Sequence, residues 1–328
     1  MKLRSRWYHS LPAILIGLLL VGICACGCMG TPEQKPVPTT VATPVPTTTG
    51  PGQTPAAGTP VPTTEGAVTP TVPPHPVSQI PGRLVVTGST TVLPIAQAAA
   101  EAYMEKNQVA EILVAGGGSS VGVQTVGDMN SGIGMSSRDL KAEEKARYPA
   151  LVQHTIARDC IVVIVHPSNP VSALTLDQVR GIYNGTIPSW EKVGGGLSAF
   201  VVIGRDSASG TREYFTEHVM QKEKYRSDMR EMNSNGAIAQ YVARNRDAIG
   251  YVGLGYLSGE VKGLAITSRG TPVEPSVATV LSGTYPISRS LYMFTSGTPS
   301  GLTKDYLDFL MSPEGQQIVE KEGFVPLK

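Results

Sequence analysis

The chain lacks an excess of charge of either sign, which limits the partners it can have. It carries 27 Lys and Arg against 26 Asp and Glu, a formal net charge of +1. Binding to nucleic acid or to an anionic membrane surface draws on clustered positive charge. A platform of aromatic side chains for bases also needs a basic groove beside it, and the charge balance indicates none. No nucleic acid partner is therefore expected.

The motifs of metal and nucleophile chemistry are also missing. Three of the four cysteines lie within the first 28 residues, so Cys160 stands alone and no disulfide forms within the rest of the chain. Cys160 opens an apolar run that ends at Val165, which predicts a buried core residue. The histidines show no metal-ligand spacing, and no Walker A motif or Gly-x-Ser-x-Gly elbow occurs. We expect no metal, no other cofactor and no enzymatic activity.

The N-terminus has the pattern of a lipoprotein signal. Basic residues precede an apolar run over 11–23 that is too short to cross a membrane. Small residues stand before Cys26 and before Cys28, and Ile23 supplies the aliphatic residue that favours Cys26, although Cys28 stays open. The alternative is a signal anchor with incidental cysteines. Residues 1–28 therefore predict an extracytoplasmic protein, lipid-anchored to the outer face of the cytoplasmic membrane.

A stalk of low apolar content follows. Residues 29–80 are rich in Pro and Thr, and Val-Pro-Thr-Thr occurs at 37–40 and again at 61–64. Such a segment buries too little apolar surface to form a core, so we expect a semi-extended, solvated stalk. The folded domain then spans 81–328, and we expect it to be a monomer.

The folded domain alternates strands with helices, which predicts an α/β fold with a mostly parallel sheet. Its length approaches the upper size of a single core, so two lobes are expected. We predict strands over 83–87, 111–115, 161–165 and 200–203, helices over 92–106, 121–129 and 212–220, and a helical C-terminus over 302–322 with a new segment at Pro313.

Three turns between a strand and a helix share one composition. They are Gly88–Thr91, Gly116–Ser120 and Arg205–Thr211. A helix N-terminus offers unpaired N–H groups and a partial positive charge, and glycine lets the backbone approach an anion closely. Arg205 can add a two-bond guanidinium contact. The three turns together predict a site for a tetrahedral oxyanion.

Each turn also has a structural interpretation, because Ser, Thr and Asp are ordinary helix caps and Gly is an ordinary turn residue. The recurrence of the pattern in three turns favours the anion site. A fourth segment, Gly134–Leu140, adds two hydroxyls, Arg138 and Asp139. Protonated phosphate needs a hydrogen-bond acceptor, which Asp139, Asp206 or a serine oxygen can supply. Arg138 is a competing cation, with a salt bridge to a neighbouring acid as its alternative role.

Taken together, the motifs resemble those of the phosphate-binding proteins of ABC-type phosphate importers. The resemblance spans residue 82 to the end of the chain and rests on several segments in order. These are Gly-Ser-Thr-Thr-Val-Leu-Pro-Ile-Ala, Gly-Gly-Gly-Ser-Ser-Val-Gly, Ile-Gly-Met-Ser-Ser-Arg-Asp-Leu, Tyr-Asn-Gly-Thr-Ile-Pro-Ser-Trp, Arg-x-x-x-Ser-Gly-Thr-Arg and Tyr-Pro-Ile-Ser-Arg.

The resemblance implies a type II, two-lobed periplasmic-binding-protein fold with the anion in the cleft between the lobes. Lobe one would hold about 82–165 and 283–328, and lobe two about 166–282. Some family members have Asp after the first Ser of the fourth motif, where this chain has Ser137, so the phosphate-proton acceptor stays open. The implied ligand donors are Ser89, Thr90, Ser119, Ser120, Ser137, Arg205, Ser209, Gly210 and Thr211.

The function implied by the resemblance is capture of inorganic phosphate and its delivery to an ABC permease in the membrane. One alternative is a receptor for sulfate, molybdate or tungstate. Another is a surface sensor that uses the same fold without transport.

Overall fold

The structure is a computed structural model that describes residues 79–268 and 270–327, all within one compact unit, Ala67–Lys328. The expected signal segment 1–28, its candidate anchors Cys26 and Cys28, and nearly all of the expected stalk lie outside the described residues. Within the described part of the chain, no helix has the length and apolar character needed to cross a membrane.

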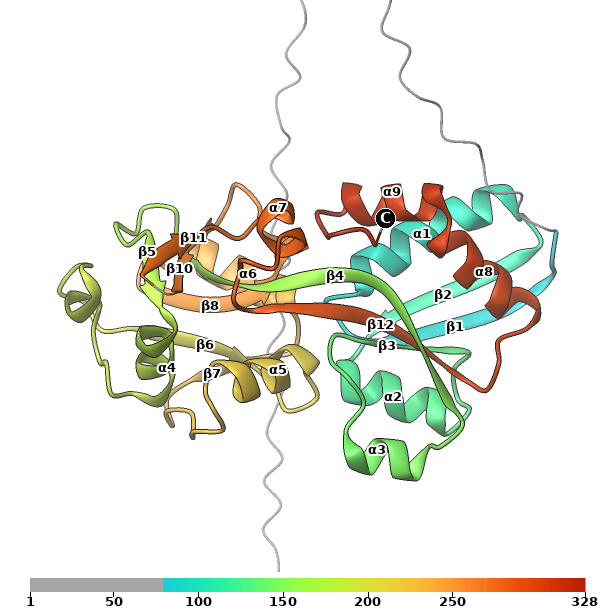
Figure 1. The fold of residues 1–328 in the computed structure, drawn as a ribbon, viewed down its shortest axis with the longest axis horizontal. Helices are drawn as coiled ribbons and strands as arrows, with labels where there is room; N and C mark the ends of the chain where they lie inside the picture. The colour runs from blue at the N-terminus through green and yellow to red at the C-terminus, as the bar shows by residue number, and fades with distance from the viewer. Residues whose placement is uncertain (1–78, 269, 328) are drawn as a thin grey trace, which may run out of the picture. The chain divides into compact units, whose positions relative to one another are not determined.

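Lobe one is built on three parallel strands whose faces are both covered by helices. Figure 1 shows α1, α8 and α9 on one face of the strands and α2 and α3 on the other. Its buried core includes Val86, Ile95, Tyr103, Met135 and Phe309. The elements are β1 (Gly82–Gly88), α1 (Leu93–Lys106), β2 (Ala110–Gly116), α2 (Ser119–Gly127), β3 (Ile133–Ser136), α3 (Ala142–Arg147), α8 (Gly301–Met311) and α9 (Pro313–Lys321).

Lobe two has its own core, which includes Val163, Tyr183, Ile203, Phe215 and Tyr251. Its helices and short helical turns are α4 (Leu176–Asn184), η1 (Trp190–Val193), α5 (Gly210–His218), α6 (Asn235–Arg244), η2 (Leu254–Tyr256) and α7 (Val277–Leu281). Its strands are β5 (Ala173–Thr175), β6 (Val201–Arg205), β7 (Arg230–Met232), β8 (Ala248–Gly253), β9 (Lys262–Gly263), β10 (Ala265–Ser268) and β11 (Thr271–Val273).

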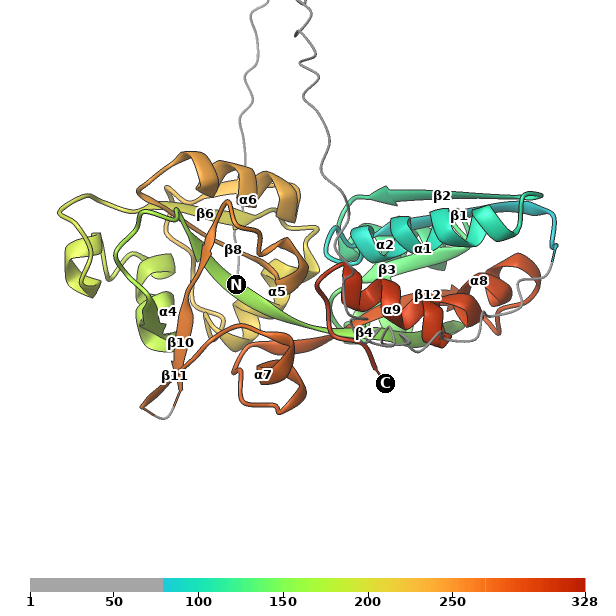
Figure 2. The same ribbon diagram turned by 90° about the horizontal axis from the view of Figure 1, so that it is seen from above.

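Two long strands, β4 (Leu151–Val165) and β12 (Ser288–Ser296), join the lobes (Figure 1 and Figure 2). They pair antiparallel with each other, and the larger of the two sheets in the described residues runs β2-β1-β3-β12-β4-β8-β6-β7, with β9 paired to β4. The smaller sheet runs β11-β10-β5. Ala157 packs in the core of lobe one, whereas Cys160 packs in that of lobe two. Likewise, Ile287, just before β12, packs in the core of lobe two, whereas Leu291 on β12 packs in that of lobe one. The cores thus meet partway along these strands, a few residues from the lobe limits expected from the sequence.

Most predicted elements appear, with informative differences at their ends. α2 and α5 begin two residues earlier than predicted, so Ser119 and Gly210 are each the first residue of a helix. β4 begins at Leu151, ten residues before the predicted strand. Its first part was not predicted as a strand because it is only partly buried and carries polar residues. The pairings of β4 and β12 are antiparallel, whereas β1 with β2 and β6 with β8 are parallel, so the sheet is mixed.

Candidate functional site

Buried hydroxyl side chains from both lobes meet where strands end and helices begin. In lobe one they follow β1, open α2 and follow β3, and in lobe two they cap and open α5. β1 and β3 are parallel neighbours, so their carboxyl ends lie at the same edge of the sheet. We call this set the hydroxyl cluster: Ser89, Thr90, Thr91, Ser119, Ser137, Ser209 and Thr211, all buried.

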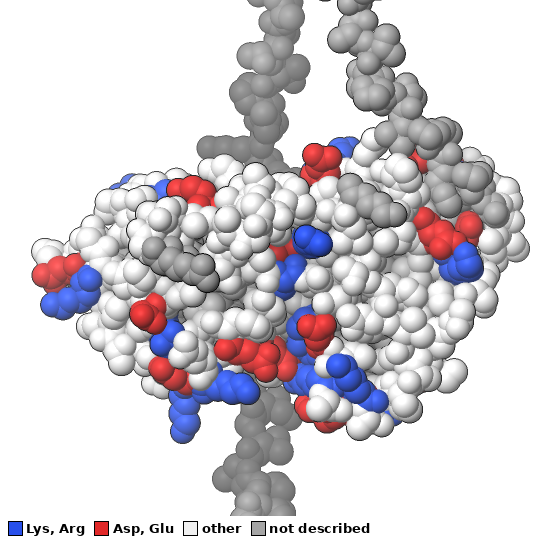
Figure 3. Space-filling model, viewed as in Figure 1, with Lys and Arg blue, Asp and Glu red and all other residues white. Residues whose placement is uncertain are grey.

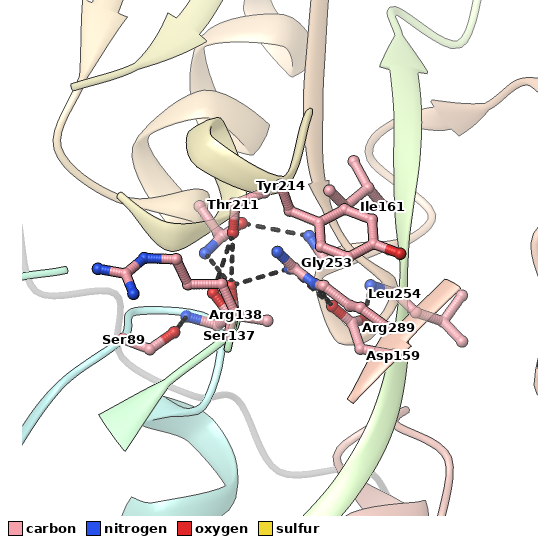
Figure 4. Close-up of polar contacts among 12 residues, drawn as sticks. Ser89, Ser137, Arg138, Asp159, Ile161, Thr211, Tyr214, Gly253, Leu254 and Arg289 are labelled. Carbon is pink, nitrogen blue, oxygen red and sulfur yellow. Dashed lines mark hydrogen bonds and ion pairs between the residues drawn. The ribbon is translucent and has the colours of Figure 1, made fainter. Parts of the chain in front are cut away.

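The cluster closes the gap between the lobes by direct contact. Thr211 Oγ1, from lobe two, lies 3.0 Å from Thr91 Oγ1 and 3.5 Å from Ser137 Oγ, both from lobe one. Ser137 Oγ lies 3.3 Å from Ser119 Oγ. Figure 4 shows Thr211 directed toward Ser137, with the side chains of β4 and β12 beside them. Three loops of the predicted anion site and the fourth segment therefore converge.

Glycine is required at two points of this contact. A Cβ on Gly118, whose φ is +97°, would lie 2.5 Å from the carbonyl oxygen of Ala208 in the other lobe. A Cβ on Gly210 would lie 2.2 Å from Ser119 Oγ. Both distances are far shorter than van der Waals contact. The lobes can approach this closely only because both side chains are absent.

Most of the hydroxyls accept a hydrogen bond from the protein, so their own hydrogens are available to a ligand. The N–H of Thr91 donates to Ser89 Oγ (3.2 Å), and that of Arg212 donates to Ser209 Oγ (3.2 Å). The N–H of Ser137 donates to Ser119 Oγ (3.0 Å). The cluster is thus arranged as a set of donors, which suits an anion.

Asn235, the first residue of α6, fixes the hydroxyl directions on one side of the cluster. Its Nδ2 donates to Thr90 Oγ1 and to Thr91 Oγ1, each at 3.1 Å. Thr91 Oγ1 also accepts from Arg289 Nη2 at 3.3 Å, so its hydrogen is directed to Thr211 Oγ1. Thr211 consequently keeps its own hydrogen for donation. Sequence analysis missed Asn235, which stands after a serine cap in an ordinary helix-start pattern.

Arg205 is almost completely buried, at 1% exposure, and its guanidinium has no carboxylate partner among the described residues. Nε donates to the carbonyl oxygen of Met232 (3.2 Å) and Nη2 to that of Asn233 (3.1 Å). Burial lowers the pKa of Arg205. The two carbonyls orient the group without neutralising it, so its charge and its remaining N–H groups are available to an anion.

Arg138 lies in a different setting, at the rim of the cluster. Its Nη1 and Nη2 each donate to Glu144 at 2.7 Å, and its Nε lies 2.5 Å from Glu213 Oε2 in lobe two. Lys141 Nζ also lies 2.9 Å from Glu213. Arg138 therefore takes the structural salt-bridge role. Figure 3 shows the resulting group of charged side chains where α5 faces α3.

The structure places three other predicted residues outside the cluster. Ser120 donates its N–H to Ala208 O (3.1 Å), and its Oγ accepts from Arg138 Nη2 (3.1 Å). Asp139 is exposed, and Asp206 Oδ1 accepts the N–H of Ala208 at 3.2 Å in a local turn. Neither of the two carboxylates considered as proton acceptors therefore reaches the hydroxyl cluster in this arrangement.

Sequence analysis also missed an ion pair on the strands that join the lobes. Asp159 on β4 and Arg289 on β12 are register partners. Asp159 Oδ2 accepts from Arg289 Nε (2.9 Å) and Nη2 (2.7 Å), while Oδ1 accepts the N–H of Leu254 (2.8 Å). The available signal was a carboxylate at Asp159, directly before the apolar run 160–165, since buried carboxylates are paired.

Beside the cluster is a cleft of about 440 Å3 lined by both lobes, including Arg138, Glu213, Tyr214, Arg289 and Tyr292. Among the described residues, no group of three or more His, Cys, Asp or Glu side chains could hold a metal ion. Cys160 is buried, and burial raises the pKa of its thiol, as a core residue requires.

Comparison with known proteins places the chain in a family. A model of the PBP superfamily domain matches residues 49–314. The phosphate-binding protein PstS of Bacillus subtilis is 33% identical over 249 residues, which cover 75% of this chain and 81% of the relative. PstS of Pseudomonas aeruginosa is 30% identical over 298 residues, with 83% and 92% covered.

A solved structure from Clostridium perfringens gives the same result for the fold. It is described as a phosphate ABC transporter substrate-binding protein with bound phosphate, it is 36% identical, and it covers 75% of this chain and 100% of its own with a TM-score of 0.71. The two-lobed α/β fold expected from the sequence is thereby confirmed. The chain belongs to the PBP superfamily and, within it, to the family of phosphate-binding proteins of ABC-type phosphate importers.

Proposed function

We propose that this chain is a receptor that captures inorganic phosphate in the hydroxyl cluster and delivers it to an ABC permease. The observation that carries the proposal is the set of hydroxyls from both lobes whose acceptor sides are engaged within the protein, as at Ser89, Ser119 and Ser209. Such a set donates to an oxyanion, and Arg205 adds a buried charge without a carboxylate partner. Membership of the family supports the choice of phosphate.

The proposed ligand donors come from both lobes, so binding depends on closure. Lobe one supplies the hydroxyls of Ser89, Thr90, Ser119 and Ser137, and lobe two supplies those of Ser209 and Thr211. The first N–H groups of α5, including that of Gly210, have no partner within the helix. An anion held by both sides stabilises the closed state, which the permease can then recognise. The chain acts as a binding protein and performs no chemistry on its ligand.

Titration calorimetry tests this function on the full-length chain in detergent. Phosphate, sulfate and molybdate are each titrated at the same pH and ionic strength. We expect phosphate to bind with the highest affinity. Absence of binding for all three anions would overturn the oxyanion site itself, and tighter binding of sulfate or molybdate would overturn the choice of phosphate alone.

One observation favours a sulfate receptor as the second candidate. Monohydrogen phosphate carries a proton that needs an acceptor, whereas sulfate does not. The carboxylates of Asp139 and Asp206 both lie outside the cluster. In the phosphate interpretation a serine oxygen accepts a hydrogen bond from that proton, and Ser137 Oγ, which touches only other hydroxyls, is placed to do so. Ser137→Ala would then weaken phosphate binding more than sulfate binding.

The location proposed for the receptor is outside the cytoplasmic membrane, held by a lipid on Cys26 or Cys28. The basic, apolar and small-residue pattern of 1–28 supports this placement. Replacing both cysteines by serine should release the chain from membranes into the soluble fraction. Retention in the membrane without a lipid mass on the chain would contradict it.

A further inference from the structure

A second buried arginine lies next to the hydroxyl cluster, on a strand that joins the lobes. Arg289 belongs to β12, and its side chain is 1% exposed. Asp159 holds Nε and Nη2, and Nη2 also donates to Thr91 Oγ1 at 3.3 Å. Thr91 Oγ1 in turn touches Thr211 Oγ1 at 3.0 Å. Figure 4 shows Arg289 and Asp159 beside these hydroxyls. Arg289 is thus one side chain away from the opening of α5.

The third nitrogen of this guanidinium has no acceptor. Nη1 is buried and makes no hydrogen bond to any of the described residues. An N–H of a charged group that is shielded from water and left without an acceptor carries a substantial free-energy penalty. The ring of Tyr214 lies with its centroid 5.9 Å from the Arg289 Cζ and offers at most a weak cation–π contact. Asp159 therefore orients the guanidinium of Arg289, and Nη1 remains without an acceptor.

Arg205 and Arg289 also act on each other. They come from β6 in lobe two and from the joining strand β12, and both are buried beside the same cluster. Burial lowers the pKa of Arg205, and the positive charge of Arg289 lowers it further. Repulsion between two cations in a region of low dielectric is relieved by an anion between them. No carboxylate among the described residues pairs with Arg205.

We propose that Arg289 is a ligand-binding residue of the oxyanion site, that its Nη1 donates to the bound anion, and that Asp159 positions its guanidinium. This inference rests on the proposed function and adds to it a second cation from the joining strands. Closure then places the anion within reach of two guanidinium groups, those of Arg205 and Arg289. Because β4 and β12 carry the pair, occupancy of the site is linked directly to the strands that connect the lobes.

Separating a binding role from a structural role requires removal of both members of the pair. Arg289→Gln leaves Asp159 buried and unpaired, so it should lower both the melting temperature and the affinity for phosphate. The double variant Asp159→Asn/Arg289→Gln removes both charges and keeps similar shapes. We expect it to recover most of the melting temperature of the wild type while its phosphate affinity stays about tenfold or more below wild type. Recovery of wild-type affinity together with stability would overturn the proposal.

Two further variants complete the test, all in the full-length chain. Arg158→Gln removes the same charge from the exposed face of β4, one residue from Asp159, and should leave phosphate affinity unchanged. Arg289→Lys keeps a charge beside Asp159, but one ammonium cannot replace a fork that holds Asp159 and presents Nη1. A clear loss of affinity in Arg289→Lys supports the proposal even if the double variant does not fold, and wild-type affinity overturns it. If the wild type itself binds no oxyanion, the proposed function fails instead, and this inference with it.

Discussion

Arg138, directly after Ser137, and Arg205, at the end of β6, are both buried, at 5% and 1% exposure, yet their surroundings differ in charge. Arg138 is held by the carboxylates of Glu144 and Glu213, whereas Arg205 is held by the carbonyls of residues 232 and 233. Burial alone lowers the pKa of an arginine, as it does for Arg205, but the two carboxylates raise that of Arg138. Between these two arginines, the charge of the partners rather than the depth of burial separates a structural ion pair from a candidate for anion binding.

The ion pairs at the rim and the donors of the interior therefore have different roles. At the rim, opposite charges on the two lobes meet directly, because Glu213 of α5 contacts Arg138 and Lys141 of lobe one. In the interior, the hydroxyls and Arg205 present donors that no carboxylate satisfies. The rim can therefore hold the lobes together without a ligand, while the interior gains most when an anion is present.

The largest expected effect is the difference in phosphate affinity between Arg205→Ala and Arg138→Ala. Removing one partner of a buried charged contact costs roughly 2–5 kcal/mol, so Arg205→Ala should lose affinity tens-fold or more. Arg138→Ala should lose less affinity but melt at a lower temperature, because it leaves Glu144 and Glu213 unpaired. Calorimetric titration and thermal unfolding of both variants give the comparison. Near-wild-type affinity in Arg205→Ala would place the anion elsewhere.

Sequence could assign the hydroxyl loops and could name Arg205 as a donor, but it left the role of Arg138 open. Gly-Ser-Thr and Ser-Gly-Thr turns after strands indicate anion-binding helix starts locally, and parallel strands bring their ends together. The role of Arg138 depends on Glu213, which is 75 positions away in the other lobe and becomes a neighbour only after folding. The direction of the hydroxyls depends on Asn235, which looks like an ordinary helix start.

The fold shows the same division between local and distant causes. The apolar run at 161–165 predicted a buried strand, and it forms the last third of β4 within the core of lobe two. The first half of β4 escaped prediction because it pairs with β12, more than a hundred positions later, and needs no continuous apolar run of its own. Which strands join the lobes is therefore set by long-range pairing.

Acid should weaken the rim before the interior. Burial would raise the pKa of Glu144, but hydrogen bonds from Arg138 and from the backbone of Lys141 outweigh it and hold the pKa below its ordinary value of 4.5. A carboxylate with a depressed pKa stabilises the fold above that ordinary value, and the contribution is lost as the pH falls through the folded-state pKa. Glu144→Gln should remove roughly 1.5–3 kcal/mol at pH 7, as for a hydrogen bond between charged groups.

Thermal unfolding across pH checks this expectation. Wild type should melt at a higher temperature than Glu144→Gln at pH 7, and the gap should narrow toward pH 3. A gap that stays constant with pH would show that the glutamine acts through packing rather than through the lost charge. Phosphate affinity at pH 7 should change less in Glu144→Gln than in Arg205→Ala, since Glu144 touches no residue of the hydroxyl cluster.

A smaller effect is expected from single hydroxyls, and two of them form a matched pair. Thr211→Val removes a hydroxyl whose hydrogen is available to the anion, whereas Ser120→Ala removes one that accepts from Arg138. A neutral hydrogen bond contributes about 0.5–1.5 kcal/mol, so Thr211→Val should weaken phosphate binding by about two- to tenfold. Ser120→Ala should bind like wild type. Equal losses in the two variants would remove the distinction between cluster and rim.

The smallest effect, and the most sensitive to salt, should come from Glu213→Gln. Its carboxylate joins Arg138 and Lys141 across the cleft, but it is 27% exposed and therefore partly screened. Exposed pairs contribute about 0–1 kcal/mol, so phosphate should dissociate at most about fivefold faster, with little change in the association rate. The difference from wild type should be largest at low ionic strength and should fade as salt is raised, because salt weakens the same contact in the wild type. Stopped-flow release of phosphate at two salt concentrations measures it. A loss of affinity that is independent of salt would mean that Glu213 shapes the interior site directly, and the separation of rim from interior would fail.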